Sequence, residues 1–220
     1  MEGRTFTRNP GQRRPFNRPI TRPSTREERV IVLDFLKNGY PDDPRPFHMK
    51  EPIVQTIGKT HFVLLEIVAA KGAHFGSHEE LYIGEGEWDR AKVSYIKGVL
   101  PINKLTQTAR NELEFVLGNL VDANPQKFIE FFNKAGAVSL RYHQFELLPG
   151  VGKRHSEELI KARQEKPFEN FDDIKKRVSS ISNPKQIIID RIIQELEGKD
   201  RYKLFVGATA RTPESPSGGR

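Results

Sequence analysis

The residues with the most specific spacing for ligand binding follow Pro149. Gly150-Val151-Gly152 forms a tight turn, and a helical pattern starts directly after it. The amide N–H groups at the start of a helix have no helical acceptor, and such groups bind phosphate. Lys153 and Arg154 follow the turn and would add positive charge to the same phosphate. This spacing predicts a phosphate-binding turn.

A second group of candidate residues is the set of arginines near the N-terminus. Residues 1–29 contain eight arginines, no lysine and three glutamates, which gives a net charge of +5. Arginine makes bidentate contacts with phosphates and stacks on exposed bases, and structured RNA offers both. The alternative is a solvated tail that attracts nucleic acid without specificity. The arginines that we expect to contact RNA are Arg13, Arg14, Arg18 and Arg22.

Aromatic residues among strand-like segments form a third group. Proteins bind single strands by stacking bases on aromatic rings in a basic groove, and each stack contributes about 1–3 kcal/mol. The candidates are Tyr82, Trp88 and Tyr95, with Lys97 as a charged neighbour. Phe62 lies in the apolar run HFVLLEIV, so we expect it in the core.

Patterns for catalysis or metal binding are weak by comparison. The sequence has no cysteine, which excludes disulfides, thiolate zinc sites, iron–sulfur clusters and cysteine nucleophiles. His74 and His78 lie beside Glu79 and Glu80 in a glycine-bearing loop, where solvated histidines are expected rather than metal ligands. The sequence has no Walker loop, dinucleotide fingerprint or nucleophile elbow. We therefore predict no catalytic residue and no metal site.

The elements that must position these residues divide into a strand-like part and a helical part. Short β-branched segments between turns predict five strands over residues 29–103, arranged as a small closed or sandwiched sheet. Gly58-Lys59 predicts a tight hairpin between two of them. Residues 200–208 (RYKLFVG and its flanks) predict a further strand that returns to the sheet.

Residues 104–199 have helical spacing instead. Apolar side chains recur three and four positions apart from Leu113 to Val121, which indicates one buried helix face. Asn124-Pro125 and Asn183-Pro184 combine an N-cap residue with a first-turn proline, so each predicts the start of a helix. The fold class predicted is therefore α+β.

Charge and composition distinguish the ends of the chain from the folded part. Residues 1–28 contain four prolines and few apolar side chains, so we expect a disordered tail, and residues 209–220 predict a second flexible end. The whole chain has a net charge of +7, but residues 30–210 contain 26 basic and 25 acidic side chains. No apolar run approaches the roughly 20 residues of a membrane span, and no signal peptide is recognisable. We expect a soluble, cytoplasmic protein without membrane partners.

Residues 147–178 resemble the helix-hairpin-helix motif, in which apolar-Gly-apolar-Gly precedes a small residue, here Ser156. The resemblance implies backbone-phosphate binding without base readout, and a monovalent cation on the hairpin carbonyls would be in keeping with it. DNA glycosylases of this class have a catalytic aspartate where Asp172 lies, and their lyase members have a lysine where Arg154 lies. An arginine stays protonated and cannot act as an amine nucleophile, so the glycosylase hypothesis is rejected. The alternative is an αα-hairpin that serves only in packing or in protein contacts and binds no nucleic acid.

The layout of residues 29–208 resembles an archaeal family of unknown function, whose members are described as predicted nucleic-acid-binding proteins with an OB-type fold. This resemblance implies a small OB-like barrel followed by the helix-hairpin-helix domain. Together these observations predict a non-enzymatic nucleic-acid-binding protein that favours RNA over DNA and associates with the ribosome or the translation machinery. The alternatives are an accessory factor of DNA repair or recombination, and a protein-interaction scaffold.

Overall fold

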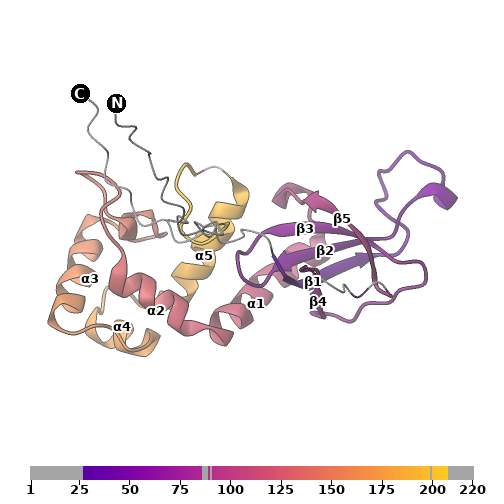
Figure 1. Ribbon diagram of the computed structural model, residues 1–220. Helices are drawn as coiled ribbons and strands as arrows, with labels where there is room; N and C mark the ends of the chain where they lie inside the picture. Colours follow the sequence, from indigo (N-terminus) through magenta and orange to yellow (C-terminus); the bar gives the residue numbers. More distant parts are fainter. Residues whose placement is uncertain (1–26, 86–88, 90, 199, 208–220) are drawn as a thin grey trace, which may run out of the picture.

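The protein folds as an α+β structure in which a curled antiparallel sheet precedes a group of helices (Figure 1). The computed structural model describes residues 27–85, 89, 91–198 and 200–207. Trp88 and the arginines Arg13, Arg14, Arg18 and Arg22 lie outside the described residues, as do residues 209–220. The α+β class predicted from the sequence is confirmed.

Five strands form one sheet in the order β4-β1-β2-β3-β5, and every neighbouring pair is antiparallel. The register is irregular in β1 and at two points between β3 and β5. Such irregularities increase the local twist and bend a strand, which fits the half-barrel shape of this sheet. The strands are β1 (Arg29–Leu36), β2 (Ile53–Gly58), β3 (Leu64–Ala69), β4 (Glu80–Tyr82) and β5 (Val93–Val99).

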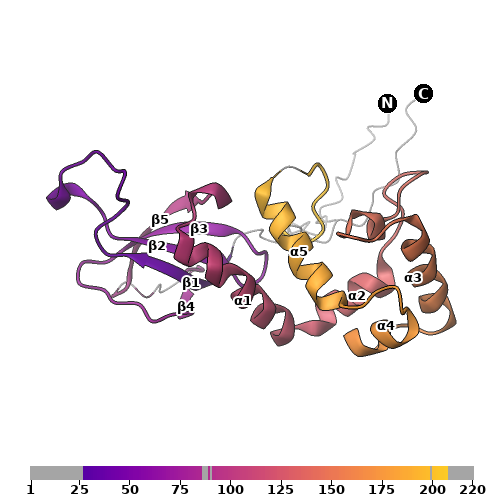
Figure 2. The ribbon, with the colours of Figure 1, turned by 180° about the vertical axis from the view of Figure 1, so that it is seen from behind.

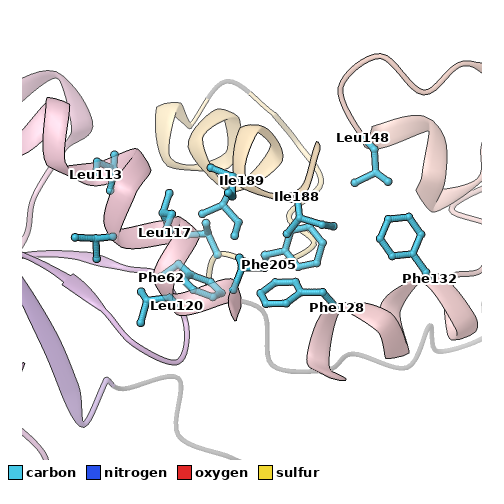
Figure 3. Packing of buried hydrophobic residues seen from close by; sticks show 14 of the residues in the cluster. Phe62, Leu113, Leu117, Leu120, Phe128, Phe132, Leu148, Ile188, Ile189 and Phe205 are labelled. Atoms are coloured by element: carbon cyan, nitrogen blue, oxygen red, sulfur yellow. The ribbon is translucent and has the colours of Figure 1, made fainter. Parts of the chain in front are cut away.

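Both faces of the central strands are buried, because the curl covers one face and the helices cover the other. Val30 and Val32 of β1 belong to a small core inside the curl. Ile31 and Leu33, on the opposite face of the same strand, belong to a larger core shared with the helices. Figure 3 shows that this larger core runs from Leu113 past buried phenylalanines to the helical end of the molecule. Because each face of β1 packs in one of the two cores, the sequence of this strand is nearly continuously apolar.

The link between β2 and β3 is longer than the tight hairpin predicted at Gly58-Lys59. β2 ends at Gly58 and β3 begins at Leu64, so five residues separate them. The carboxylate of Glu27 accepts hydrogen bonds from the backbone amides of Thr60, His61 and Val63 at 2.7–3.3 Å. This buried carboxylate stabilises an open loop that local turn preferences do not predict.

Glu27 also changes the expected start of the folded part. The predicted disordered segment was residues 1–28, but Glu27 is only 3% exposed, and the Glu28 carbonyl accepts a hydrogen bond from the Ile83 amide. Residues 27 and 28 therefore belong to the fold.

The helical half is connected to the sheet through α1, which contacts β1 and also α5 (Figure 2). Proline and asparagine mark the starts of α2 and α5, as the sequence predicts. In the described part of the chain, no helix is long and apolar enough to cross a membrane. The α-helices are α1 (Gln107–Ala123), α2 (Pro125–Lys134), α3 (Lys153–Glu165), α4 (Phe171–Arg177) and α5 (Pro184–Glu197), and three short 3-10 helices are η1 (Phe47–Met49), η2 (Ile102–Lys104) and η3 (Gln144–Leu147).

The sequence predicts a returning strand over residues 200–208. This prediction is wrong for the described residues 200–207, which contain no strand. The buried Glu195 carboxylate accepts hydrogen bonds from three successive amides of this segment, those of residues 204–206, at 2.6–2.9 Å. Arg191, itself 3% exposed, donates to the same carboxylate and to Asp200. The segment does reach the sheet side, because the Gly207 amide donates to the His61 carbonyl. Side-chain acceptors on α5 thus replace the ladder that a strand would need.

Candidate nucleic-acid interface

The turn from Leu148 to Gly152 joins η3 to α3. Gly150 has φ = +72°, a left-handed conformation that glycine adopts without steric cost. Val151 is 5% exposed, and its amide donates to the Leu148 carbonyl, so this residue anchors the turn to the core. Gly152 is the N-cap residue of α3, with φ −87° and ψ −177°. The element before the turn is a four-residue 3-10 helix.

The start of α3 presents polar backbone groups to solvent. The Gly152 carbonyl accepts from the Ser156 amide, so the amides that precede Ser156 in the helix have no acceptor within it. No side chain caps this helix, whereas Asn170 caps α4 and Asn183 caps α5. Open space lies beside the α-carbons of both Gly150 and Gly152. An anion can therefore approach this helix end closely.

The two basic residues of the turn are not equivalent. Lys153 is exposed and forms no ion pair within the described residues. The Arg154 side chain is 88% exposed and donates to the Glu158 carboxylate at 3.1 Å. The Ser180 hydroxyl and Arg154 together lower the pKa of Glu158, so this carboxylate stays ionised and offsets the arginine charge. Lys153 is consequently the freer of the two cations.

The other residues of this motif pack on the core or stabilise the start of a helix. Ser156 is 2% exposed and Leu159 is fully buried, so this face of α3 packs on the core. Asp172 and Asp173 lie in the first turn of α4, where the Asn170 side chain accepts from the Asp173 amide. Asp173 also accepts from Arg177 at 3.1 Å. These contacts agree with a helix-start role for the aspartate pair.

The described aromatic candidates of the sheet lie on its first and last strands in the pairing order. Tyr82 lies on β4 and Tyr95 on β5, which are the two edge strands. The Tyr82 hydroxyl donates to the Glu85 carbonyl, and the Arg29 guanidinium lies 5.5 Å from the centre of its ring. Tyr95 is 41% exposed and donates to the Glu51 carboxylate at 2.7 Å. Each ring is therefore held by a hydrogen bond of its hydroxyl group and is partly exposed.

Lys97 is paired with a carboxylate rather than free. Its ammonium forms an ion pair with Glu66, which is 8% exposed on β3. The same carboxylate accepts from the Tyr40 hydroxyl, which in turn accepts from the Gln55 amide. Burial, followed by smaller effects that include Glu66, raises the pKa of Tyr40 to about 12. Sequence spacing does not indicate this cluster, because its members come from β2, β3, β5 and the loop after β1.

The two histidines of the loop before β4 have different surroundings, and only His74 is solvated as predicted. His78 contacts the Glu112 carboxylate through Nε2 at 2.6 Å, and its ring lies 5.1 Å from that of Phe115. His74 is exposed. Within the described residues, no three metal-ligating side chains come together.

Sequence reasoning also missed a basic group at the junction of sheet and helices. Arg29, Lys59 and Lys127 line one cavity, although they are distant from one another in the sequence. Lys59 is recognisable in the sequence as a basic residue near the aromatic candidates, but sequence spacing does not connect it with Arg29 and Lys127.

Comparison with known proteins places the whole described fold in one group. The uncharacterized protein MJ0038 from Methanocaldococcus jannaschii is 36% identical over 187 residues, which are 84% of this chain and 82% of that protein. The crystal structure of Af1531 from Archaeoglobus fulgidus is similar with a TM-score of 0.74 and 41% identity, covering 81% of this chain and 99% of that one. The DUF655 family, described as a protein of unknown function, matches residues 26–207. On this evidence the chain belongs to the DUF655 family.

Proposed function

We propose that this protein binds nucleic acid without catalysing a reaction and that RNA is its preferred ligand. The observation on which the proposal rests is the exposed start of α3. Its first amides lack acceptors within the helix, and they lie beside the left-handed Gly150 and beside Lys153, which forms no ion pair with the described residues. Backbone amides contact phosphate oxygens and do not distinguish bases, so the contact is with the nucleic-acid backbone. In this proposal, the segment from η3 to α4 acts as a helix-hairpin-helix element.

In this proposal, the curled sheet acts as an OB-type barrel. Its strand order places β1 between β2 and β4, and pairing of β4 with β5 would complete a partly open five-stranded barrel. Barrels of this type bind single strands by stacking bases on aromatic side chains. Tyr82 and Tyr95 are the described candidates, and Trp88 is a further one outside the described residues. We therefore assign an unpaired segment of the ligand to the sheet.

The preference for RNA rests on the arginine-rich N-terminal segment. Arg13, Arg14, Arg18 and Arg22 supply bidentate phosphate contacts and stacking on exposed bases, both of which suit folded RNA. The described body is nearly neutral by composition, so long-range attraction must come mainly from this segment. Ribosomal RNA or another component of translation is the target class that we favour.

A competition experiment tests this function. Structured RNA, single-stranded RNA and duplex DNA would compete for binding to the full chain and, separately, to a chain lacking residues 1–26. Each competition would be measured at two salt concentrations. Deletion ends at residue 26 because Glu27 supports the β2–β3 loop. Each lost phosphate contact should reduce the log–log salt slope by about 0.7–0.9.

The expected result is that the full chain prefers RNA over duplex DNA, and that the shortened chain binds more weakly and with a smaller preference for RNA. Equal affinity for duplex DNA would favour a DNA-repair accessory factor instead. If neither chain binds any nucleic acid, the proposal is wrong, and the helical half becomes a candidate protein-docking scaffold.

A further inference from the structure

A second candidate binding site lies where the sheet meets the helices. A cavity of about 460 Å³ opens there, which is within the roughly 300–1,000 Å³ range of small-ligand sites. Phe62, Leu120 and Phe128 form its apolar wall, and Figure 3 shows these three side chains close together. None of the residues around the cavity belongs to the turn that begins α3.

Lys127 places a partly buried ammonium in this cavity. Its Nζ donates to the Thr60 carbonyl at 2.7 Å and lies 4.6 Å from the centre of the Phe62 ring. Within the described part of the chain, no carboxylate forms an ion pair with it, although the charge of Glu27 acts on it from a greater distance. Burial lowers the pKa of this lysine. An ammonium has three N–H donors, so two remain for another acceptor.

Two further cations lie at the same cavity. Arg29 and Lys59 both pair with Glu80, at 2.8 and 2.6 Å, so that two cations share one carboxylate. The nearby carboxylate of Glu27 is already occupied by three backbone amides. The three cations therefore lie near only two carboxylates, those of Glu80 and Glu27, which leaves a net charge of +1 at the cavity.

The first turn of α2 also contributes to the cavity wall. Asn124, the N-cap residue of α2, lines the cavity, and its side chain accepts no hydrogen bond from the helix. Asn124 is also the C-cap residue of α1, so the negative end of the α1 dipole lies beside the positive end of the α2 dipole, and the excess positive charge comes from the three cations.

We propose that this cavity binds the phosphate group of a nucleotide, with Lys127 as the central contact and with Arg29 and Lys59 at the rim. The cavity volume accounts for a nucleotide rather than a bare anion, because about 460 Å³ is the size of a site for a small organic ligand. The site goes beyond the backbone contact proposed above and does not depend on it. The nucleotide is either free or the terminal residue of an RNA strand, since both present the same phosphate chemistry.

Binding of adenosine 5′-monophosphate to the full chain tests the site, with adenosine and inorganic phosphate as partial ligands. The key variant is Lys127→Met, which removes the ammonium and keeps an unbranched apolar side chain. Its matched control is Lys134→Met on the same helix, because Lys134 is exposed and pairs with Glu130 outside the cavity. Isothermal titration calorimetry measures each affinity, and thermal unfolding checks each fold.

Lys127→Met should weaken nucleotide binding by about tenfold or more, since it removes a charge-assisted hydrogen bond. Lys134→Met should change it less than about twofold, as expected for an exposed charge that is screened by solvent. Lys127→Arg should retain most of the affinity. If Lys127→Met fails to fold, Lys59→Met at the rim serves instead, with a several-fold loss expected at unchanged stability. Absence of binding at millimolar nucleotide, or equal losses in the Lys127→Met and Lys134→Met variants, overturns the proposal.

Short RNAs with a 5′-phosphate or a 5′-hydroxyl then distinguish the two sources. Displacement of the mononucleotide by the phosphorylated strand alone identifies a strand terminus, whereas displacement by neither strand identifies a free nucleotide. Gly152→Asp, which alters the start of α3, should leave mononucleotide affinity unchanged. A loss in that variant equal to the loss in Lys127→Met would place the nucleotide at the hairpin and refute the cavity site.

Discussion

The substitution Gly152→Asp separates phosphate binding at α3 from the stability of α3. Gly152 has an extended backbone that any residue can adopt, and open space surrounds its α-carbon. Aspartate is among the most favoured N-cap residues because its carboxylate accepts hydrogen bonds from the first helical amides. The variant should therefore be as stable as the native protein, or more stable by a few tenths of a kcal/mol.

The same carboxylate should strongly reduce RNA binding. It occupies the amides that we assign to a phosphate, and it places a negative charge where the phosphate would lie. One hydrogen bond to a charged group contributes about 1.5–3 kcal/mol, and each 1.4 kcal/mol is about a factor of ten in affinity. We therefore expect a loss of at least about tenfold. Fluorescence anisotropy with a labelled single-stranded RNA, at one fixed salt concentration, measures it.

Two control variants isolate the cause. Gly152→Asn occupies the same amides without adding charge, so it should give an intermediate loss. Asn119→Asp adds the same charge at an exposed position of α1 and should change affinity less than about twofold. Native RNA affinity in a folded Gly152→Asp variant would refute the assignment of the phosphate to the start of α3.

Three further predictions concern the fold. Gly150→Ala forces a side chain into the left-handed region and should lower the unfolding free energy by about 1–2 kcal/mol, measured by thermal denaturation; an unchanged melting temperature contradicts this. Glu195→Gln removes the buried carboxylate that Arg191 and three backbone amides share, although Asp200 remains as an ion-pair partner of Arg191. The variant should cost about 1.5–3 kcal/mol in urea unfolding, whereas a loss below about 1 kcal/mol would contradict a stabilising role of this network. Since the pKa of Tyr40 is raised from 10 to about 12, the stability that its neutral form contributes is fully present below pH 10 and is lost as the pH rises to about 12. Absorbance titration should show one tyrosine ionising near pH 12 that disappears in Tyr40→Phe; its persistence in that variant would contradict the assignment.

Local patterns predict much of this fold because they reflect short-range physics. The apolar spacing of α1 and the Asn-Pro starts of α2 and α5 depend on residues within one or two helical turns. Gly150 is predictable for the same reason, because a left-handed turn needs a residue without a Cβ. These features follow from the order of residue types alone.

The errors arise where a distant side chain decides the backbone. Residues 204–206 have β-prone sequence, but the Glu195 carboxylate binds their amides, so no strand forms. Glu27 similarly holds open a loop that Gly58-Lys59 alone would close tightly. Lys127 joins Arg29 and Lys59 only after the sheet packs on the helices, so sequence spacing could not reveal that cavity.

The most direct test of the central claim is an NMR titration of the full chain with a short single-stranded RNA, observing backbone amides. We predict that the amides of residues 150–155 shift progressively and saturate at the affinity measured by anisotropy. The same amides should shift much less in the Gly152→Asp variant at equal RNA concentration. Saturation of RNA binding without any change at residues 150–155 would contradict phosphate binding by this turn.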